Sequence, residues 1–131
     1  MARYKLHCSL ITPEAKVFEG DVDSVVVPAH DGEIGILLDR APLVCQLGAG
    51  RMKVRTRDAE HVWFVDGGFA QVIDNRVTVL TQKALPPGQI DRAEATRALE
   101  EARKMPATDE TGYHRRTRAE ASARARLRMS S

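Results

Sequence analysis

The chain has 131 residues, of which 43% are hydrophobic, and a formal net charge of +2 at pH 7, as expected for one small domain or a domain with an appendage. No stretch reaches the roughly 18–20 uninterrupted apolar residues of a membrane span, and the first ten residues lack the apolar run of a signal peptide. We therefore expect a cytoplasmic protein whose two cysteines, Cys8 and Cys45, stay reduced.

The first two thirds of the chain read as β-structure. In 51–56 (RMKVRT), apolar residues alternate with basic ones, which is the pattern of a strand with one buried face. The segments 22–27 (VDSVVV) and 61–65 (HVWFV) are rich in β-branched and aromatic residues, and we expect Trp63 in the core. Cys8 alternates with polar residues in the same pattern as Leu6 and Leu10, so we interpret it as a small buried hydrophobic residue.

Turn signals separate these strands at intervals of about ten residues. They occur at 12–13, 19–20, 31–32, 48–50, 57–58 and 67–68. Asp74 and Asn75, which tolerate positive φ, predict a further tight hairpin. Because no helical pattern lies between the strands, we predict a mainly β fold in which residues 1–86 form an antiparallel β-sandwich.

The pattern changes after Pro86, where Pro87 and Gly88 predict a linker. A helix over about 91–105 follows, with Asp91 as N-cap and Glu94 completing a capping box. Pro106 ends it, 107–114 reads as a loop, and a second helix is predicted over about 116–129, with Thr117 and Glu120 as its capping box. Residues 87–131 are thus predicted to form a C-terminal helical hairpin.

The two predicted helices have thin apolar stripes, made mostly of alanine with one leucine each. Burying a leucine contributes about 1.5–3 kcal/mol, which is far less than the cost of ordering a helix of this length. We therefore expect the helices to lie on the sandwich, to move, or to dock onto a partner.

No motif of an enzyme is present. Gly48 and Gly50 precede a strand rather than a helix, so we interpret them as a turn and not as a phosphate loop. A small metal enzyme would need ligands from Cys8, Cys45, His7, His30, His61 and His114, but none of their spacings is typical of a metal site. We expect no catalytic residue, no metal and no cofactor.

The excess positive charge lies at the C-terminus, where residues 107–131 hold six arginines and three acidic residues. Arginine-rich segments bind phosphates, so a β-sandwich module with a tail for nucleic acid is one alternative. No aromatic residue follows Tyr113 to stack on bases, which favours a solvated or protein-facing helix instead.

Two stretches carry a resemblance to a known family: 31–44 (DGEIGILLDRAPLV) and 65–81 (VDGGFAQVIDNRVTVLT). Together with 10–29 (LITPEAKVFEGDVDSVVVPA), they resemble the ε subunit of the rotary F-type ATP synthase. The resemblance covers residues 4–105 and extends more loosely to 129. It implies a non-catalytic subunit of the central rotor that joins the γ subunit to the membrane c-ring, peripheral to the bacterial inner membrane on its cytoplasmic side.

The resemblance also implies roles for individual residues. The contacts to the c-ring are expected from Asp31, Glu33, Asp39 and Arg40. The helical tail is expected to extend toward the α/β catalytic head and restrain ATP hydrolysis, with contacts from Arg116, Arg118, Arg124, Arg126 and Arg128. Some family members bind ATP at the first helix through a motif that matches Ile90 and Asp91 here. Glu94 stands at that motif's arginine position, so we expect no nucleotide sensing.

Overall fold

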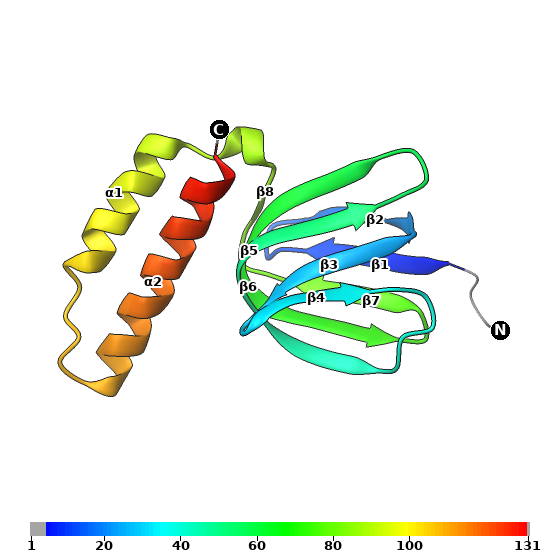
Figure 1. The fold of residues 1–131 in the computed structure, drawn as a ribbon, viewed down its shortest axis with the longest axis horizontal. Helices are drawn as coiled ribbons and strands as arrows, with labels where there is room; N and C mark the ends of the chain where they lie inside the picture. The colour runs from blue at the N-terminus through cyan, green and yellow to red at the C-terminus, as the bar shows by residue number, and fades with distance from the viewer. Residues whose placement is uncertain (1–4, 131) are drawn as a thin grey trace.

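The computed structural model describes residues 5–130 and contains a β-sandwich followed by two helices (Figure 1). The strands are β1 (Leu6–Ile11), β2 (Lys16–Val22), β3 (Ser24–Ala29), β4 (Gly32–Ile36), β5 (Leu43–Arg55), β6 (Glu60–Ile73), β7 (Arg76–Leu80) and β8 (Ala84–Leu85). A short 3₁₀ turn, η1 (Pro87–Gln89), leads into α1 (Arg92–Arg103) and α2 (Glu110–Met129).

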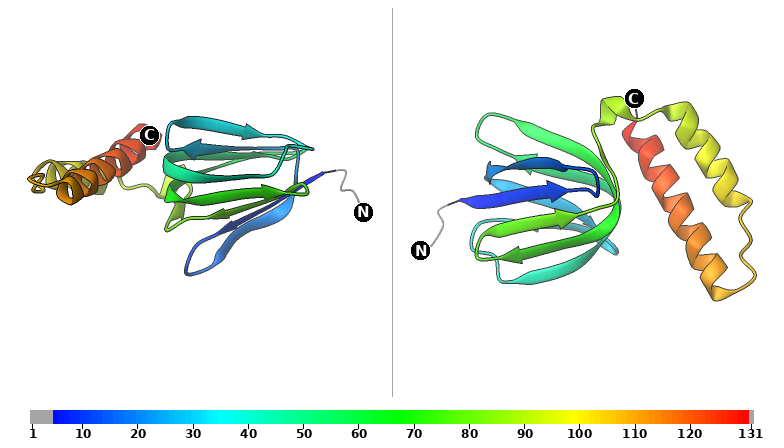
Figure 2. Two further views of the ribbon diagram at one scale, coloured as in Figure 1. Left: turned by 90° about the horizontal axis from the view of Figure 1, so that it is seen from below. Right: turned by 180° about the vertical axis from the view of Figure 1, so that it is seen from behind.

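The strands form one continuous sheet in the order β2-β1-β7-β6-β5-β3-β4, with β8 added beside β6. The long strands β5 and β6 bend midway, so the first half of β5 pairs with the second half of β6 in one layer and the remaining halves pair in the other. Figure 2 shows the two layers edge-on, with both helices beyond one end. The predicted β-sandwich is confirmed, and one neighbouring pair, β1 with β7, is parallel.

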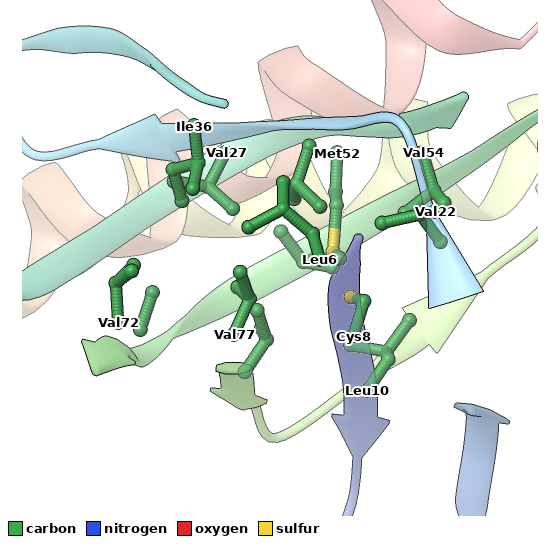
Figure 3. Close-up of a cluster of buried hydrophobic side chains, with 14 of the residues drawn as sticks. Leu6, Cys8, Leu10, Val22, Val27, Ile36, Met52, Val54, Val72 and Val77 are labelled. Carbon is green, nitrogen blue, oxygen red and sulfur yellow. The ribbon is translucent and has the colours of Figure 1, made fainter. Parts of the chain in front are cut away.

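The core lies between the two layers and is almost entirely aliphatic (Figure 3). Leu6, Cys8 and Leu10 alternate along β1 and are at most 1% exposed. Burial raises the pKa of the Cys8 thiol to about 12, because the thiolate would lose its hydration there. The predictions of a buried Cys8 and a buried Trp63 are both confirmed.

Three predicted turns lie inside strands instead. Gly48 and Gly50 belong to β5, Gly67 and Gly68 belong to β6, and 19–20 lies within β2. The glycines bend the paired strands without ending them. A Cβ at Gly68, whose φ is +106°, would lie 1.9 Å from the carbonyl oxygen of Leu80. The predicted hairpin at 74–75 is confirmed, with positive φ at both residues.

The predicted N-cap of the first helix is confirmed, since the carboxylate of Asp91 accepts a hydrogen bond from the backbone nitrogen of Glu94 at 3.2 Å, and the helix ends at Arg103, two residues before the predicted end. The second helix begins earlier than predicted, at Glu110 rather than near 116. Its N-cap is Asp109, which accepts from the backbone nitrogen of Gly112 at 2.7 Å. The prediction of a capping box at Thr117 and Glu120 is therefore wrong.

The two helices pack against each other, and α2 lies between α1 and the bend of β5 and β6 (Figure 1). Their buried side chains are small: Ala95, Ala102, Ser122, Ala123 and Ala125. Neither helix, among residues 5–130, combines the length and the apolar character needed to cross a membrane.

Candidate functional site

Two of the four predicted c-ring residues lie at the tight turn between β3 and β4, which we call the acidic turn. Asp31 occupies the turn itself, and Glu33 lies one residue into β4, opposite Pro28. Both residues are exposed. The turn is short because Gly32, with a φ of 141°, follows directly after it.

The other two predicted residues follow the far end of β4. The backbone nitrogen of Asp39 donates to Oδ1 of Asn75 at 2.6 Å, and Nδ2 of Asn75 donates back to the Asp39 carboxylate at 3.1 Å. This pairing fixes Asp39 in the left-handed region, with a φ of 65°. Nη1 of Arg40 is 3.5 Å from the carbonyl oxygen of Gly35.

The structure therefore separates the four residues into two pairs. Because β4 is extended over Gly32–Ile36, roughly 13 Å of strand lies between the acidic turn and the loop that holds Asp39. In the ribbon, the acidic turn is at the end of the sandwich near the helices, and the 37–42 loop is at the opposite end (Figure 1). Sequence proximity alone gave no sign of this separation.

The outer face of β5, β6 and β7 carries a group of exposed apolar side chains, which we call the apolar sheet face. Its members are Val44, Phe69, Ile73 and Leu80, which are 69%, 56%, 45% and 50% exposed. Phe69 lies directly opposite Leu80 in the sheet, so the two form a cross-strand pair. This face was not predicted from the sequence, although each member alternates with core residues along its strand. Clustered exposed apolar side chains mark contact surfaces.

Three of the five predicted tail arginines are engaged within the helical hairpin. Arg116 and Arg124 both bind the carboxylate of Glu120, at 2.8 and 3.2 Å, and lie one turn to either side of it on α2. These two guanidinium groups lower the pKa of Glu120, with the hydrogen bond from Arg116 as the largest cause. Arg126 instead reaches across to α1.

The partner of Arg126 is Glu94, whose Oε2 lies 2.7 Å from Nη1 of the arginine. The predicted capping box is therefore only half formed, because the Glu94 side chain is used for this ion pair. Arg118 and Arg128 form no ion pair among residues 5–130 and are exposed.

A side-chain hydrogen bond connects α2 to the sandwich. Oγ of Ser122 donates to Oδ2 of Asp66 in β6 at 3.0 Å. Asp66 directly precedes the glycines at 67–68, and nothing in its sequence context indicates a contact 56 residues away. A groove of about 410 Å³ is lined by both Glu33 and Arg128, so the acidic turn and the end of α2 are neighbours.

A polar cluster covers the outer side of β1 and β2. The ring nitrogens of His7 lie 3.1 Å from the Asp21 carboxylate and 3.2 Å from that of Glu19. Lys16 and then His7 hold the pKa of Glu19 down, at about 2. Within residues 5–130, no group of three or more His, Cys, Asp or Glu side chains is arranged to hold a metal ion.

Comparison with known proteins assigns the chain to a family. Residues 5–87 match the family model described as ATP synthase, Delta/Epsilon chain, beta-sandwich domain. The ATP synthase epsilon chain of Rhodopirellula baltica is 39% identical over 125 residues, which cover 95% of this chain and 98% of the relative. That of Leptospira interrogans is 38% identical over 109 residues, covering 83% and 86%.

A solved structure agrees with the sequence matches. One chain in the mitochondrial ATP synthase of Euglena gracilis, in an assembly described as OSCP/F1/c-ring, superposes with a TM-score of 0.80 at 25% identity. The match covers 95% of this chain and 81% of that one, so it includes the helices as well as the sandwich. The chain therefore belongs to the family of ATP synthase epsilon chains, non-catalytic subunits of the rotary, membrane-associated F-type complex.

Proposed function

We propose that this chain joins the γ subunit to the c-ring in the central stalk and that its helical hairpin restrains ATP hydrolysis by the catalytic head. The observation that carries the proposal is a contrast within one molecule. A rigid sandwich presents an exposed apolar sheet face, while the hairpin is docked mainly through alanines and one hydrogen bond to the sandwich.

The apolar sheet face is the proposed contact for γ. Val44, Phe69 and Leu80 lie on three adjacent strands, and each is at least half exposed. Covering such a group of large apolar side chains removes them from water, which favours a long-lived contact with another subunit. The opposite side of these strands packs against the core, so the face is already rigid before binding. It therefore loses little conformational freedom when a partner binds.

The acidic turn is the proposed contact for the c-ring, through Asp31 and Glu33. Both carboxylates are exposed on a short, well-defined turn that projects from the sandwich. Asp39 and Arg40 were expected to share this contact. Since they lie at the other end of β4, near the turn at Asn75, we propose that this second pair contributes at the edge of the γ contact instead.

The hairpin is the proposed regulatory element, and its arginines are the proposed contacts to acidic surfaces of the α/β head. Arg118 and Arg128 are exposed and unpaired among the described residues, so they are available in the docked state. Arg116 and Arg124 share Glu120 and Arg126 pairs with Glu94, and these carboxylates lower the attraction of the docked hairpin for an acidic partner.

We also propose that the hairpin binds no nucleotide at the site where some family members bind ATP. The carboxylate of Glu94 would face the phosphates, and it is already paired with Arg126. In its cellular setting, the complex is proposed to lie at the bacterial inner membrane, with this subunit on the cytoplasmic side.

The test uses the assembled complex. Deleting residues 107–131 is expected to leave γ and this subunit together and to raise ATPase activity, whereas unchanged hydrolysis would contradict the regulatory role. A Phe69→Glu variant is expected to lose co-purification with γ. Val17→Glu serves as its control, because Val17 is an exposed apolar residue on β2, outside the apolar sheet face. Equal loss in both variants would contradict the proposed γ contact.

A further inference from the structure

We propose that Glu94 occupies Arg126 in place of a carboxylate from another subunit. Arg126 can then bind that outside carboxylate only after α1 separates from α2. The ion pair between the two residues then sets the balance between a closed and an open hairpin. The regulatory consequence of this balance rests on the inhibitory role proposed above, whereas the structural claim does not.

The geometry of the 94–126 ion pair supports this assignment. Nη1 of Arg126 and Oε2 of Glu94 are 2.7 Å apart, which is the length of a strong charge-assisted hydrogen bond. The Arg126 side chain is only 11% exposed, while that of Glu94 is 49% exposed. An arginine this buried needs a counter-charge, because an unpaired buried charge is costly. Glu94 is the carboxylate that provides it.

The closed pair leaves part of the binding capacity of Arg126 unused. Its Nε is buried and has no hydrogen-bond partner among residues 5–130. A guanidinium group binds a carboxylate best through two parallel hydrogen bonds. A partner carboxylate that engaged both Nε and a terminal nitrogen would therefore bind Arg126 more completely than Glu94 does. The closed hairpin is stable, but a carboxylate that accepts both hydrogen bonds can displace Glu94 from Arg126.

Arg126 differs in this respect from the other tail arginines. Arg116 and Arg124 pair with Glu120 on their own helix, so these contacts remain when α2 moves away from α1. Arg118 and Arg128 are already exposed in the closed hairpin. Among the five predicted contacts to the catalytic head, Arg126 is thus the one whose availability depends on the hairpin being open.

A second polar contact reinforces the same end of the hairpin. Nη1 of Arg92, at the start of α1, donates to Oγ of Ser130 at 3.2 Å and lies 3.5 Å from the carbonyl oxygen of Leu127. A cation at the C-terminal end of α2 is favourable for the helix dipole. The remaining interface between the helices is built around alanines, so these polar contacts form a large share of what keeps it closed.

The first experiment measures amide hydrogen exchange in the isolated full-length protein. Glu94→Gln is expected to speed exchange in α1 and α2 about tenfold, which corresponds to about 1.4 kcal/mol of lost closure, and to leave the β1 and β7 amides unchanged. Glu101→Gln is the matched control, because Glu101 is an exposed glutamate of α1 with no ion pair among the described residues. It is expected to leave exchange unchanged.

A charge-swapped variant separates the ion pair from general packing. Glu94→Arg combined with Arg126→Glu restores opposite charges across the interface and is expected to return exchange toward the wild-type rate. Equal exchange in Glu94→Gln and Glu101→Gln would overturn the proposal. A swapped variant as open as Glu94→Gln would overturn it as well.

The second experiment measures ATP hydrolysis by the assembled complex. Glu94→Gln is expected to strengthen inhibition, because it frees Arg126 for the catalytic head. If Glu94→Gln opens the isolated hairpin but deletion of residues 107–131 does not change hydrolysis, the ion pair is supported and the inhibitory role is overturned. If the deletion raises hydrolysis and Glu94→Gln leaves exchange unchanged, the inhibitory role is supported and the ion pair is overturned.

Discussion

The sandwich and the helical hairpin of this chain are held together by different kinds of contact. The sandwich buries a continuous cluster of large aliphatic side chains, among them Leu6, Leu10, Ile36 and Met52, each at most 1% exposed. The hairpin buries alanines and a serine, and its helices are joined by one ion pair, Glu94 with Arg126, and by hydrogen bonds of Arg92. One part of the chain has a deep core, and the other has none.

This difference shows how one short chain provides both a fixed body and a movable element. Each fully buried leucine, isoleucine or valine contributes about 1.5–3 kcal/mol, and these contributions accumulate in the sandwich. A buried alanine side chain contributes only about 0.8 kcal/mol, so the interior of the hairpin adds little stability. Local opening follows the weakest contacts, so the hairpin is expected to open while the sandwich stays folded.

The largest expected effect comes from the bend in β6. Gly68→Ala is expected to destabilise the sandwich by more than about 4 kcal/mol, because the new Cβ would collide with the Leu80 carbonyl oxygen at a φ of +106°. Gly67→Ala is the control: its φ of +74° is strained as well, but nothing lies within 4 Å, so a cost of about 1–2 kcal/mol is expected. Urea unfolding measures both, and equal costs would contradict the steric explanation.

A core cavity is expected to have the next largest effect. Ile36→Ala should lower the free energy of unfolding by about 2–5 kcal/mol. Ile36 is fully buried, so the shortened side chain leaves a cavity that the neighbouring side chains fill only in part. Ile73→Ala, at a residue 45% exposed, is expected to cost less than about 1 kcal/mol in the isolated chain. A similar loss of urea stability in the two variants would show that the core is not where the stability of the sandwich resides.

A smaller effect is expected where the two regions meet. Ser122→Ala removes the hydrogen bond to Asp66 and should weaken docking of α2 by about 1 kcal/mol, the usual net contribution of one intramolecular hydrogen bond. Amide exchange in α2 is expected to rise about fivefold while exchange in β1 stays constant. If exchange rose equally in both regions, the hairpin and the sandwich would unfold as one unit.

Much of the fold was predictable because its signals are local. The hairpin at Asp74 and Asn75, the buried Cys8 and the N-cap at Asp91 each depend on a few neighbouring residues. The interior glycines were misread because a glycine that bends a strand and a glycine that ends one look the same in sequence. The early start of α2 was not predicted because its first turn contains Gly112, and glycine disfavours helix.

For the candidate site, the sequence predicted which residues take part but not how they are arranged. The charged residues of 31–40 were identified from the sequence, but their division between two ends of the sandwich was not, because it depends on the path of β4. The tail arginines were identified as well, but not which of them are paired, because the partner of Arg126 lies 32 residues away on another helix. Long-range pairings of this kind are set by tertiary packing, which local patterns do not encode.

The smallest expected effect is a pH dependence on the outer side of the sandwich. The hydrogen bonds from Lys16 and then His7 hold the pKa of Glu19 at about 2 in the folded protein, below its ordinary value of 4.5. Because the folded-state pKa is the lower one, the stabilisation from Glu19 is complete above about pH 4.5 and is lost as the pH falls toward about 2.

The urea midpoint of Glu19→Gln should therefore lie below that of the wild type at pH 7, and the two midpoints should converge as the pH falls from 4.5 toward 2. All of these groups are exposed, so concentrated salt should shrink the difference at every pH. Glu14→Gln, at an exposed residue of the neighbouring turn with no ion pair among residues 5–130, is expected to show no such convergence. A salt-independent difference would mean that Glu19 stabilises the sandwich through packing rather than through charge.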